Sequence, residues 1–154
     1  MKRFDRTRQK LRSAARLSWT DRWVVLEAWT LLLAVDLSLR LLPFYWVQKL
    51  AVRGRRVKGG LAPTVNTDAV QRLRLLVGTA ARNHVYPMRC LPRSLVLQWL
   101  LGRRGIVANL RIGVRKEEGD LRAHAWLEHG GVIVGEPQAI PASFVPLAAG
   151  KESR

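Results

Sequence analysis

Residues 19–42 form a strongly apolar run, and apolar residues then recur every three or four positions in two later segments, so three helices are predicted. The first helix is expected to begin at the capping box Ser18-Trp19-Thr20-Asp21 and to continue to about Leu42, because Pro43 stops it. The second helix is expected over residues 66–84 and the third over residues 91–102. The sequence therefore predicts that the fold begins with helices.

The apolar pattern changes after Gly105, where β-forming residues become frequent and alternation with polar residues begins. We expect strands over residues 106–114, 121–128 and 132–136, separated by turns rich in glycine and charged residues. Helices followed by a small antiparallel sheet make an α+β fold. The segment after the last strand contains three prolines and is expected to be irregular.

The first predicted helix is almost long enough to cross a bilayer, but three charged residues interrupt it. Glu27, Asp36 and Arg40 would each cost about 2.5–3.5 kcal/mol at the middle of a membrane. We therefore expect this helix to dock on its own domain, on a partner or on a membrane surface. Residues 1–17 are basic and lack the apolar core of a signal peptide, so a cytoplasmic protein is expected.

The net charge of +16 and the single cysteine limit the kinds of site and partner that the chain can have. One cysteine excludes an internal disulfide and a cysteine-based zinc site within one chain. The sequence also shows no metal-ligand spacing and no glycine-rich phosphate loop, so it predicts no cofactor. The positive charge suits an anionic surface, such as the inner face of a membrane, but solvation explains it equally well.

Cys90 lies just before the third predicted helix, which we expect to begin with Pro92 at its first position. Free N–H groups and the positive end of the helix dipole favour a thiolate there, and Arg89 and Arg93 add positive charge. Cys90 is therefore a candidate nucleophile. The alternative is a small buried apolar residue, which is the usual role of a single cysteine.

A thiol nucleophile needs a base, and His124 in the middle of a predicted strand is the best candidate. If residues 129–131 form a three-residue hairpin loop, His124 lies directly opposite Glu136, which could then orient the imidazole. A two-residue glycine turn would instead place Glu136 on the Ala125 face. Asp120 and Glu128 are alternative partners, and a purely structural strand histidine is the alternative role for His124.

Four segments resemble the lasso peptide leader peptidases, whose fold is transglutaminase-like and related to papain-type cysteine proteases. They are Cys90-Leu91-Pro92-Arg93-Ser94-Leu95, Gly105-Ile106-Val107-Ala108, Ile112-Gly113-Val114-Arg115 and Ala123-His124-Ala125-Trp126-Leu127-Glu128. The resemblance implies that Cys90 is the nucleophile, His124 the base and Glu136 the orienting acid. The family more often has aspartate in the third position. It also implies that residues 61–154 form the peptidase domain, after a basic arm, apolar helix and linker in residues 1–60.

The implied function is cleavage of the leader from a ribosomally made lasso precursor peptide. Residues 1–60 lack the strands of a winged-helix domain, so the resemblance implies a separate winged-helix leader-binding protein. A separate ATP-dependent cyclase would then close the ring, and any ATP requirement would belong to that partner. Two alternatives remain: a non-catalytic basic protein on membrane or nucleic acid, and a catalytically silent scaffold of a peptide-modifying complex. If the protein is the peptidase, nucleic acid is not a partner, whereas peripheral contact with a membrane is compatible with that function.

Overall fold

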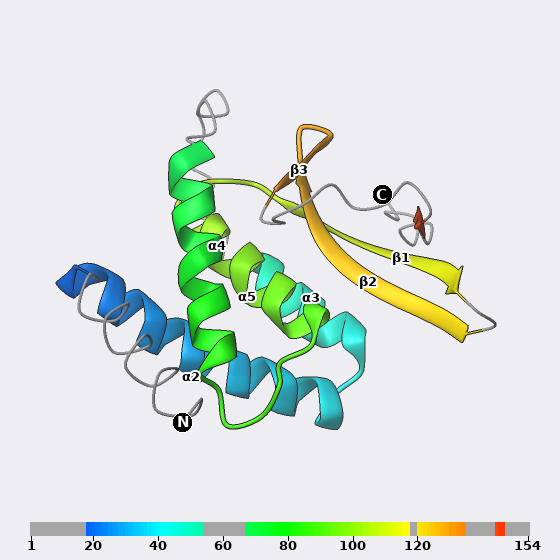
Figure 1. Ribbon diagram of the computed structural model, residues 1–154, viewed down its shortest axis with the longest axis horizontal. Coiled ribbons are helices and arrows are strands. Elements are labelled where there is room, and N and C mark those ends of the chain that lie inside the picture. The colour runs from blue at the N-terminus through cyan, green and yellow to red at the C-terminus, as the bar shows by residue number, and fades with distance from the viewer. Residues whose placement is uncertain (1–17, 54–66, 118–119, 135–143, 147–154) are drawn as a thin grey trace, which may run out of the picture.

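The computed structural model describes residues 18–53, 67–117, 120–134 and 144–146. Within these residues the chain forms helices first and then an antiparallel sheet, so the α+β prediction is confirmed (Figure 1). The helices are α2 (Trp19–Leu41), α3 (Phe44–Arg53), α4 (Thr67–Arg82) and α5 (Cys90–Arg103). The strands are β1 (Asn109–Glu117), β2 (Asp120–His129), β3 (Val132–Val134) and β4 (Val145–Pro146).

The predicted capping box at the start of α2 is present. The Ser18 hydroxyl accepts a hydrogen bond from the Asp21 N–H, and the Asp21 carboxylate accepts one from the Ser18 N–H. The helix ends at Leu41, just before Pro43, as expected. Its inner side buries Ala28 and Leu32 completely against α4 and α5. The prediction that this helix docks on its own domain is therefore confirmed, and no helix in the described part of the chain is long and apolar enough to cross a membrane.

Helix α3 was not predicted, because its first residue follows Pro43 directly and no capping side chain marks its start. Proline stops α2, but the chain re-enters a helix at once, with the Trp46 N–H bonded to the Pro43 carbonyl. Val47 and Ala51, one turn apart, bury the inner side of α3 against Leu95 of α5. The predicted domain boundary at residues 60 and 61 lies outside the described residues and stays a prediction.

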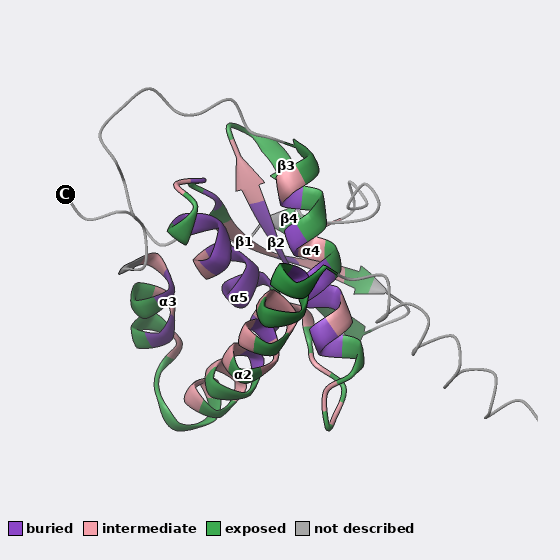
Figure 2. Cartoon of the chain, turned by 90° about the vertical axis from the view of Figure 1, so that its left-hand side faces the viewer, coloured by how far each residue is buried: buried purple, intermediate pink, exposed green. Residues whose placement is uncertain are grey.

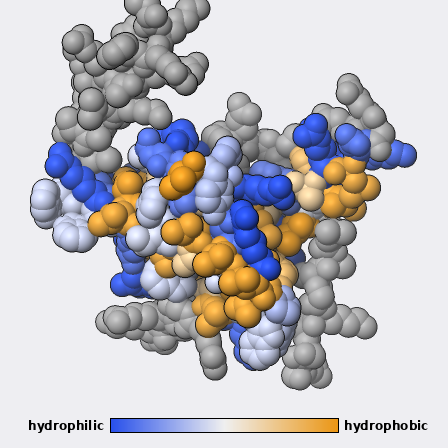
Figure 3. Space-filling view, turned by 90° about the horizontal axis from the view of Figure 1, so that it is seen from below, coloured by the Kyte–Doolittle hydropathy of each residue, from blue (hydrophilic) through white to orange (hydrophobic). Residues whose placement is uncertain are grey.

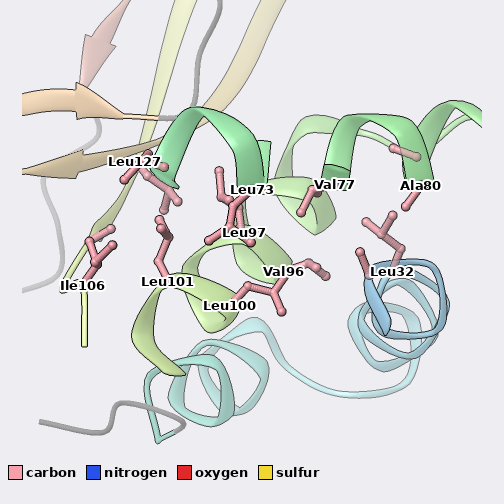
Figure 4. Packing of buried hydrophobic residues seen from close by; sticks show 14 residues of the cluster. Leu32, Leu73, Val77, Ala80, Val96, Leu97, Leu100, Leu101, Ile106 and Leu127 are labelled. Atoms are coloured by element: carbon pink, nitrogen blue, oxygen red, sulfur yellow. The ribbon is translucent and has the colours of Figure 1, made fainter. Parts of the chain in front are cut away.

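Helix α5 lies at the centre of the core, between the other helices and the sheet (Figures 1 and 2). Leu95, Val96, Leu100 and Leu101 of α5 are at most 1 % exposed. Figure 4 shows apolar side chains of α2, α4, α5 and β2 meeting around this helix. Burial of this kind contributes roughly 1.5–3 kcal/mol for each large side chain, so the position of α5 is strongly determined.

The four described strands are arranged in the order β3-β2-β1-β4, and every neighbouring pair is antiparallel. Strand β1 begins at Asn109, three residues later than predicted, and β4 was not predicted. In the β1–β2 pair, Gly113 lies opposite His124 and Ile112 opposite Ala125. Because side chains alternate along a strand, Ala125 and Leu127 share one face of β2 and His124 and Trp126 share the other.

The predicted three-residue hairpin loop after β2 is wrong. His129 pairs with Val132, so the turn consists of Gly130 and Gly131 alone. Both glycines have positive φ angles, 56° and 80°, as the favoured two-residue hairpin turns require. Leu127, and not Trp126, therefore lies opposite Val134. The register that placed Glu136 opposite His124 is not the observed one, and Glu136 itself lies outside the described residues.

Candidate functional site

Cys90 is the first residue of α5, and Arg89 occupies the N-cap position. The predicted helix began at residue 91, with Cys90 just outside it. The observed helix begins one residue earlier, at Cys90, and Pro92 lies in its first turn. Proline is tolerated throughout the first turn because those N–H groups have no partner within the helix. The prediction that Cys90 lies at a helix N-terminus is otherwise confirmed.

Cys90 borders a small cavity of about 20 Å³ between α4, α5 and the sheet. The lining residues are Arg74, Val77, Gly78, Cys90, Arg93, Ser94, Leu97, Leu127 and Val134. Apolar side chains and a glycine make up most of this lining, and its two charged residues, Arg74 and Arg93, are both cationic. A substrate carbonyl at Cys90 would therefore meet a lining of mixed polarity with positive charge beside it.

The N-terminus of α5 has no side-chain cap that would occupy its first N–H groups. Arg89 gives no side-chain cap to the first turn, and the first turn contains no acidic residue. The first N–H groups of a helix have no intrahelical acceptor, so an oxyanion that forms next to Cys90 could accept from them. Donors beside a thiol are one of the elements that acyl transfer from a carbonyl to a thiol requires.

A buried hydrogen bond joins the Cys90 helix to the His124 strand. The Ser94 hydroxyl donates to the carbonyl of Ala125 over 3.0 Å, and Ser94 is only 7 % exposed. Ser94 is one helical turn after Cys90, and Ala125 directly follows His124. The bond therefore fixes the two elements that carry the predicted nucleophile and base against each other, close to both residues.

His124 itself lies on the face of β2 that points away from Leu127 and the Cys90 cavity. Its ring is 5.7 Å from the Phe144 ring and 6.3 Å from the Trp126 ring, with which it is nearly parallel at 18°. Among contacts between described residues, none joins the Cys90 thiol to the His124 imidazole. The structure thus brings the two backbone segments together without showing the thiol–imidazole hydrogen bond.

The two alternative acids occupy other positions on β2. The Glu128 carboxylate accepts from the indole N–H of Trp126 at 3.0 Å and from the Arg111 guanidinium at 2.9 Å. Burial alone would raise the pKa of Glu128, but these two hydrogen bonds outweigh it and the pKa is lowered. Asp120 and Glu128 each lie four residues from His124, about 13 Å along the strand. At that separation neither is positioned to orient the imidazole.

Sequence reasoning did not single out Ser94 and Gly113. The available signal for Ser94 was a polar residue among leucines and a valine, one turn after a candidate nucleophile. A buried polar side chain in such a position needs a hydrogen-bond partner. A glycine within a strand often marks a close approach, and this was the signal for Gly113. A Cβ at residue 113 would lie 2.7 Å from the Trp126 ring, so only glycine lets that ring cover the sheet next to His124.

Within the described part of the chain, no group of three or more His, Cys, Asp or Glu side chains could hold a metal ion.

Comparison with known proteins agrees with this architecture. Neither the curated proteins nor the solved structures contain a match to the chain. A family model, however, matches residues 31–149, which include the second half of α2 and all three predicted catalytic positions. The superfamily that this model describes includes enzymes of the cysteine-protease type. Because the match covers most of the sequence, the chain belongs to the Transglutaminase-like superfamily.

Proposed function

We propose that this protein is a cysteine peptidase that removes the leader from a ribosomally made lasso peptide precursor. The observation that carries the proposal is the buried hydrogen bond from Ser94 to the Ala125 carbonyl. It joins a helix that begins with a partly exposed cysteine to a strand that carries a histidine one residue away. Membership of the superfamily supports cysteine-based chemistry, and the four sequence segments similar to leader peptidases support the finer assignment.

In the proposed reaction, His124 accepts the proton of the Cys90 thiol, and the Cys90 sulfur attacks the carbonyl carbon at the leader–core junction. The developing oxyanion accepts hydrogen bonds from the first-turn N–H groups of α5. The C–N bond then breaks, His124 gives a proton to the leaving amine, and a thioester links Cys90 to the leader. Water, deprotonated by His124, hydrolyses the thioester and restores the thiol.

The proposal requires the imidazole of His124 to approach Cys90 in the working complex. Because His124 lies on the face of β2 opposite to Leu127 and the Cys90 cavity, this approach requires part of β2 to change its orientation when substrate binds. Among described residues, β2 pairs with β3 only from Leu127 to His129. From Asp120 to Trp126 its single described strand neighbour is β1, so the strand edge next to His124 is not covered by β3. The observed two-residue turn removes the geometric argument for Glu136, so its orienting role is a prediction that rests on the resemblance alone.

The partners follow from the same proposal. A separate winged-helix protein would bind the leader, because α2 and α3 precede the linker with no strand among the described residues of that part. A separate ATP-dependent cyclase would use the freed core amine. We place the protein in the cytoplasm, where ribosomal precursors are made and a free thiol stays reduced.

The test is to incubate purified protein with a candidate precursor, with and without the leader-binding protein, and to analyse the products by mass spectrometry. Wild type should release leader and core, whereas Cys90→Ala and His124→Ala should release neither. His129→Ala is the matched control, because His129 lies on the same strand but bonds to the Val107 carbonyl outside the site. This variant should cleave at the wild-type rate.

Two results would contradict the assignment. Full cleavage by Cys90→Ala would exclude the nucleophile, and equal losses in His124→Ala and His129→Ala would exclude a specific base. Binding of precursor and partners by a wild-type protein that never cleaves would favour a silent scaffold. If Glu136 orients the imidazole, Glu136→Gln should lower kcat. Glu128→Gln should leave kcat unchanged, because the Glu128 carboxylate accepts hydrogen bonds from Arg111 and Trp126.

A further inference from the structure

The outward side of α2 carries large apolar side chains along its whole length. They are Trp19, Trp23, Leu26, Leu33, Leu37 and Leu41, and each is between 39 % and 72 % exposed. Their spacing of three, four or seven residues keeps them on one side of the helix. We call these six residues the outer stripe of α2. Since the opposite side of α2 is buried, this helix is apolar on both sides, unlike an ordinary surface helix.

The apolar surface continues around the end of α2 onto α3. Leu42, Pro43, Trp46, Lys49 and Leu50 line an open surface hollow of about 390 Å³. Tyr45, on the same helix, is 62 % exposed, while Trp46 and Leu50 are 54 % and 55 % exposed. In Figure 3, the molecule viewed from below shows apolar side chains gathered beside strongly hydrophilic ones.

The acidic residues of α2 are bonded to other parts of the protein or to a neighbouring cation. Asp21 accepts two hydrogen bonds from Arg72 of α4, and Glu27 pairs with Arg103 of α5. Asp36 accepts from the Tyr86 hydroxyl and from Arg40. Helix α3 contains no acidic residue. All three carboxylates of these two helices are therefore already neutralised by partners.

Cationic side chains lie against the exposed aromatic rings of the same surface. The Arg22 guanidinium carbon is 5.9 Å from the centre of the Trp19 ring. The Lys49 ammonium is 5.7 Å from the centres of both the Tyr45 and the Trp46 rings. The surface thus combines leucines, aromatic rings and positive charges, on a chain with 27 basic and 11 acidic residues.

We propose that the outer stripe of α2 and the exposed side of α3 bind the surface of an anionic lipid bilayer. Leucines would enter the boundary between headgroups and acyl chains, and the tryptophans and tyrosine would lie at headgroup level, where these residues are enriched. Lys49 and Arg22 would meet lipid phosphates, and each cation near such a surface adds favourable attraction. Charge complementarity favours this occupant, because the surface offers cations and no unpartnered carboxylate.

The experiment is sedimentation of the full chain with vesicles of phosphatidylcholine containing phosphatidylglycerol, and with vesicles of phosphatidylcholine alone. Leu37→Gln and Leu50→Gln remove apolar contacts from the proposed surface without adding charge. Leu75→Gln on α4 is the matched control, because Leu75 is 54 % exposed, against 53 % for Leu37 and 55 % for Leu50. Circular dichroism and the elution volume of each variant check that it is folded and report its oligomeric state.

Wild type should bind the anionic vesicles and bind neutral vesicles at least tenfold less. The Leu37 and Leu50 variants should bind anionic vesicles about tenfold more weakly, while the Leu75 variant stays within twofold of wild type. Absence of wild-type binding, or equal losses in all three variants, would overturn the proposal. So would a wild-type dimer that Leu37→Gln converts to monomer without vesicles, since the surface would then be a protein interface. The outcome is independent of peptidase activity.

Discussion

Replacing Ser94 with alanine tests whether the bond between α5 and β2 positions the catalytic residues. The change removes the Ser94 hydroxyl and with it the buried hydrogen bond of 3.0 Å to the Ala125 carbonyl. Such a loss costs about 1–3 kcal/mol, including the penalty for a carbonyl that loses its partner. Domains of this size have a free energy of unfolding of about 5–15 kcal/mol, so the variant should still fold.

The expected effect on activity is larger than the effect on stability. Ser94 is one turn from Cys90, and a displacement of about 1 Å in a catalytic group can lower the rate roughly 100-fold. We therefore expect kcat/KM for precursor cleavage to fall about 10- to 100-fold. Mass spectrometry of timed reactions gives the rate, and urea unfolding of the same preparation gives the stability.

Gln98→Met is the control, because Gln98 makes the equivalent bond one turn further along α5. Its amide donates to the Ala108 carbonyl over 2.8 Å, and Gln98 is 4 % exposed. The control should lose similar stability but keep cleavage within about threefold of wild type. The bond that it removes fixes a part of α5 that lies away from the site. If Ser94→Ala and Gln98→Met lose the same activity for the same stability, the positioning role of Ser94 is refuted.

Three further predictions concern the fold. Gly113→Ala should lower the free energy of unfolding by about 1–3 kcal/mol in urea titrations, because its Cβ would lie 2.7 Å from the Trp126 ring. Leu100→Ala should cost about 2–5 kcal/mol in the same assay, since Leu100 is fully buried. The hydrogen bond from Arg72 lowers the pKa of Asp21 below its usual 3.8, so its stabilising effect is present above that value and lost as pH falls through the lowered pKa. Asp21→Asn should therefore be less stable than wild type at pH 7 and should approach it in unfolding midpoints measured below pH 3.

Periodicity and capping predicted the helices that have strong local signals. The Ser18–Asp21 capping box and Pro43 set both ends of α2, and the apolar spacing in α4 matched the observed helix closely. Helix α3 was not predicted because it begins directly after Pro43, where a helix end was expected, and no capping side chain marks its start. Val47 and Ala51, one turn apart, do lie on one buried side of α3, against Leu95 of α5.

The hairpin register could not be determined from the sequence. The His129-Gly130-Gly131 segment is compatible with a three-residue loop and with a two-residue turn, because glycine adopts positive φ angles in both. The choice moves every later residue to the other face of the sheet. The position of Cys90 depended instead on a helix N-terminus marked by Pro92, which is a local feature, and the sequence located it to within one residue.

The distribution of acidic residues links the two proposals. The carboxylates of α2 and Glu128 of β2 are each paired with a cation, and Asp36 also with Tyr86. The remaining excess of positive charge is therefore available both at the Cys90 cavity, beside Arg74 and Arg93, and on the outer surface of α2 and α3. Salt distinguishes the electrostatic contribution to binding from the apolar one. It screens attraction between exposed charges beyond about 8 Å at physiological ionic strength but does not weaken the burial of apolar surface. Capture of a precursor or a bilayer should thus slow as salt rises, whereas contacts made by Leu37 and Leu50 after docking should persist.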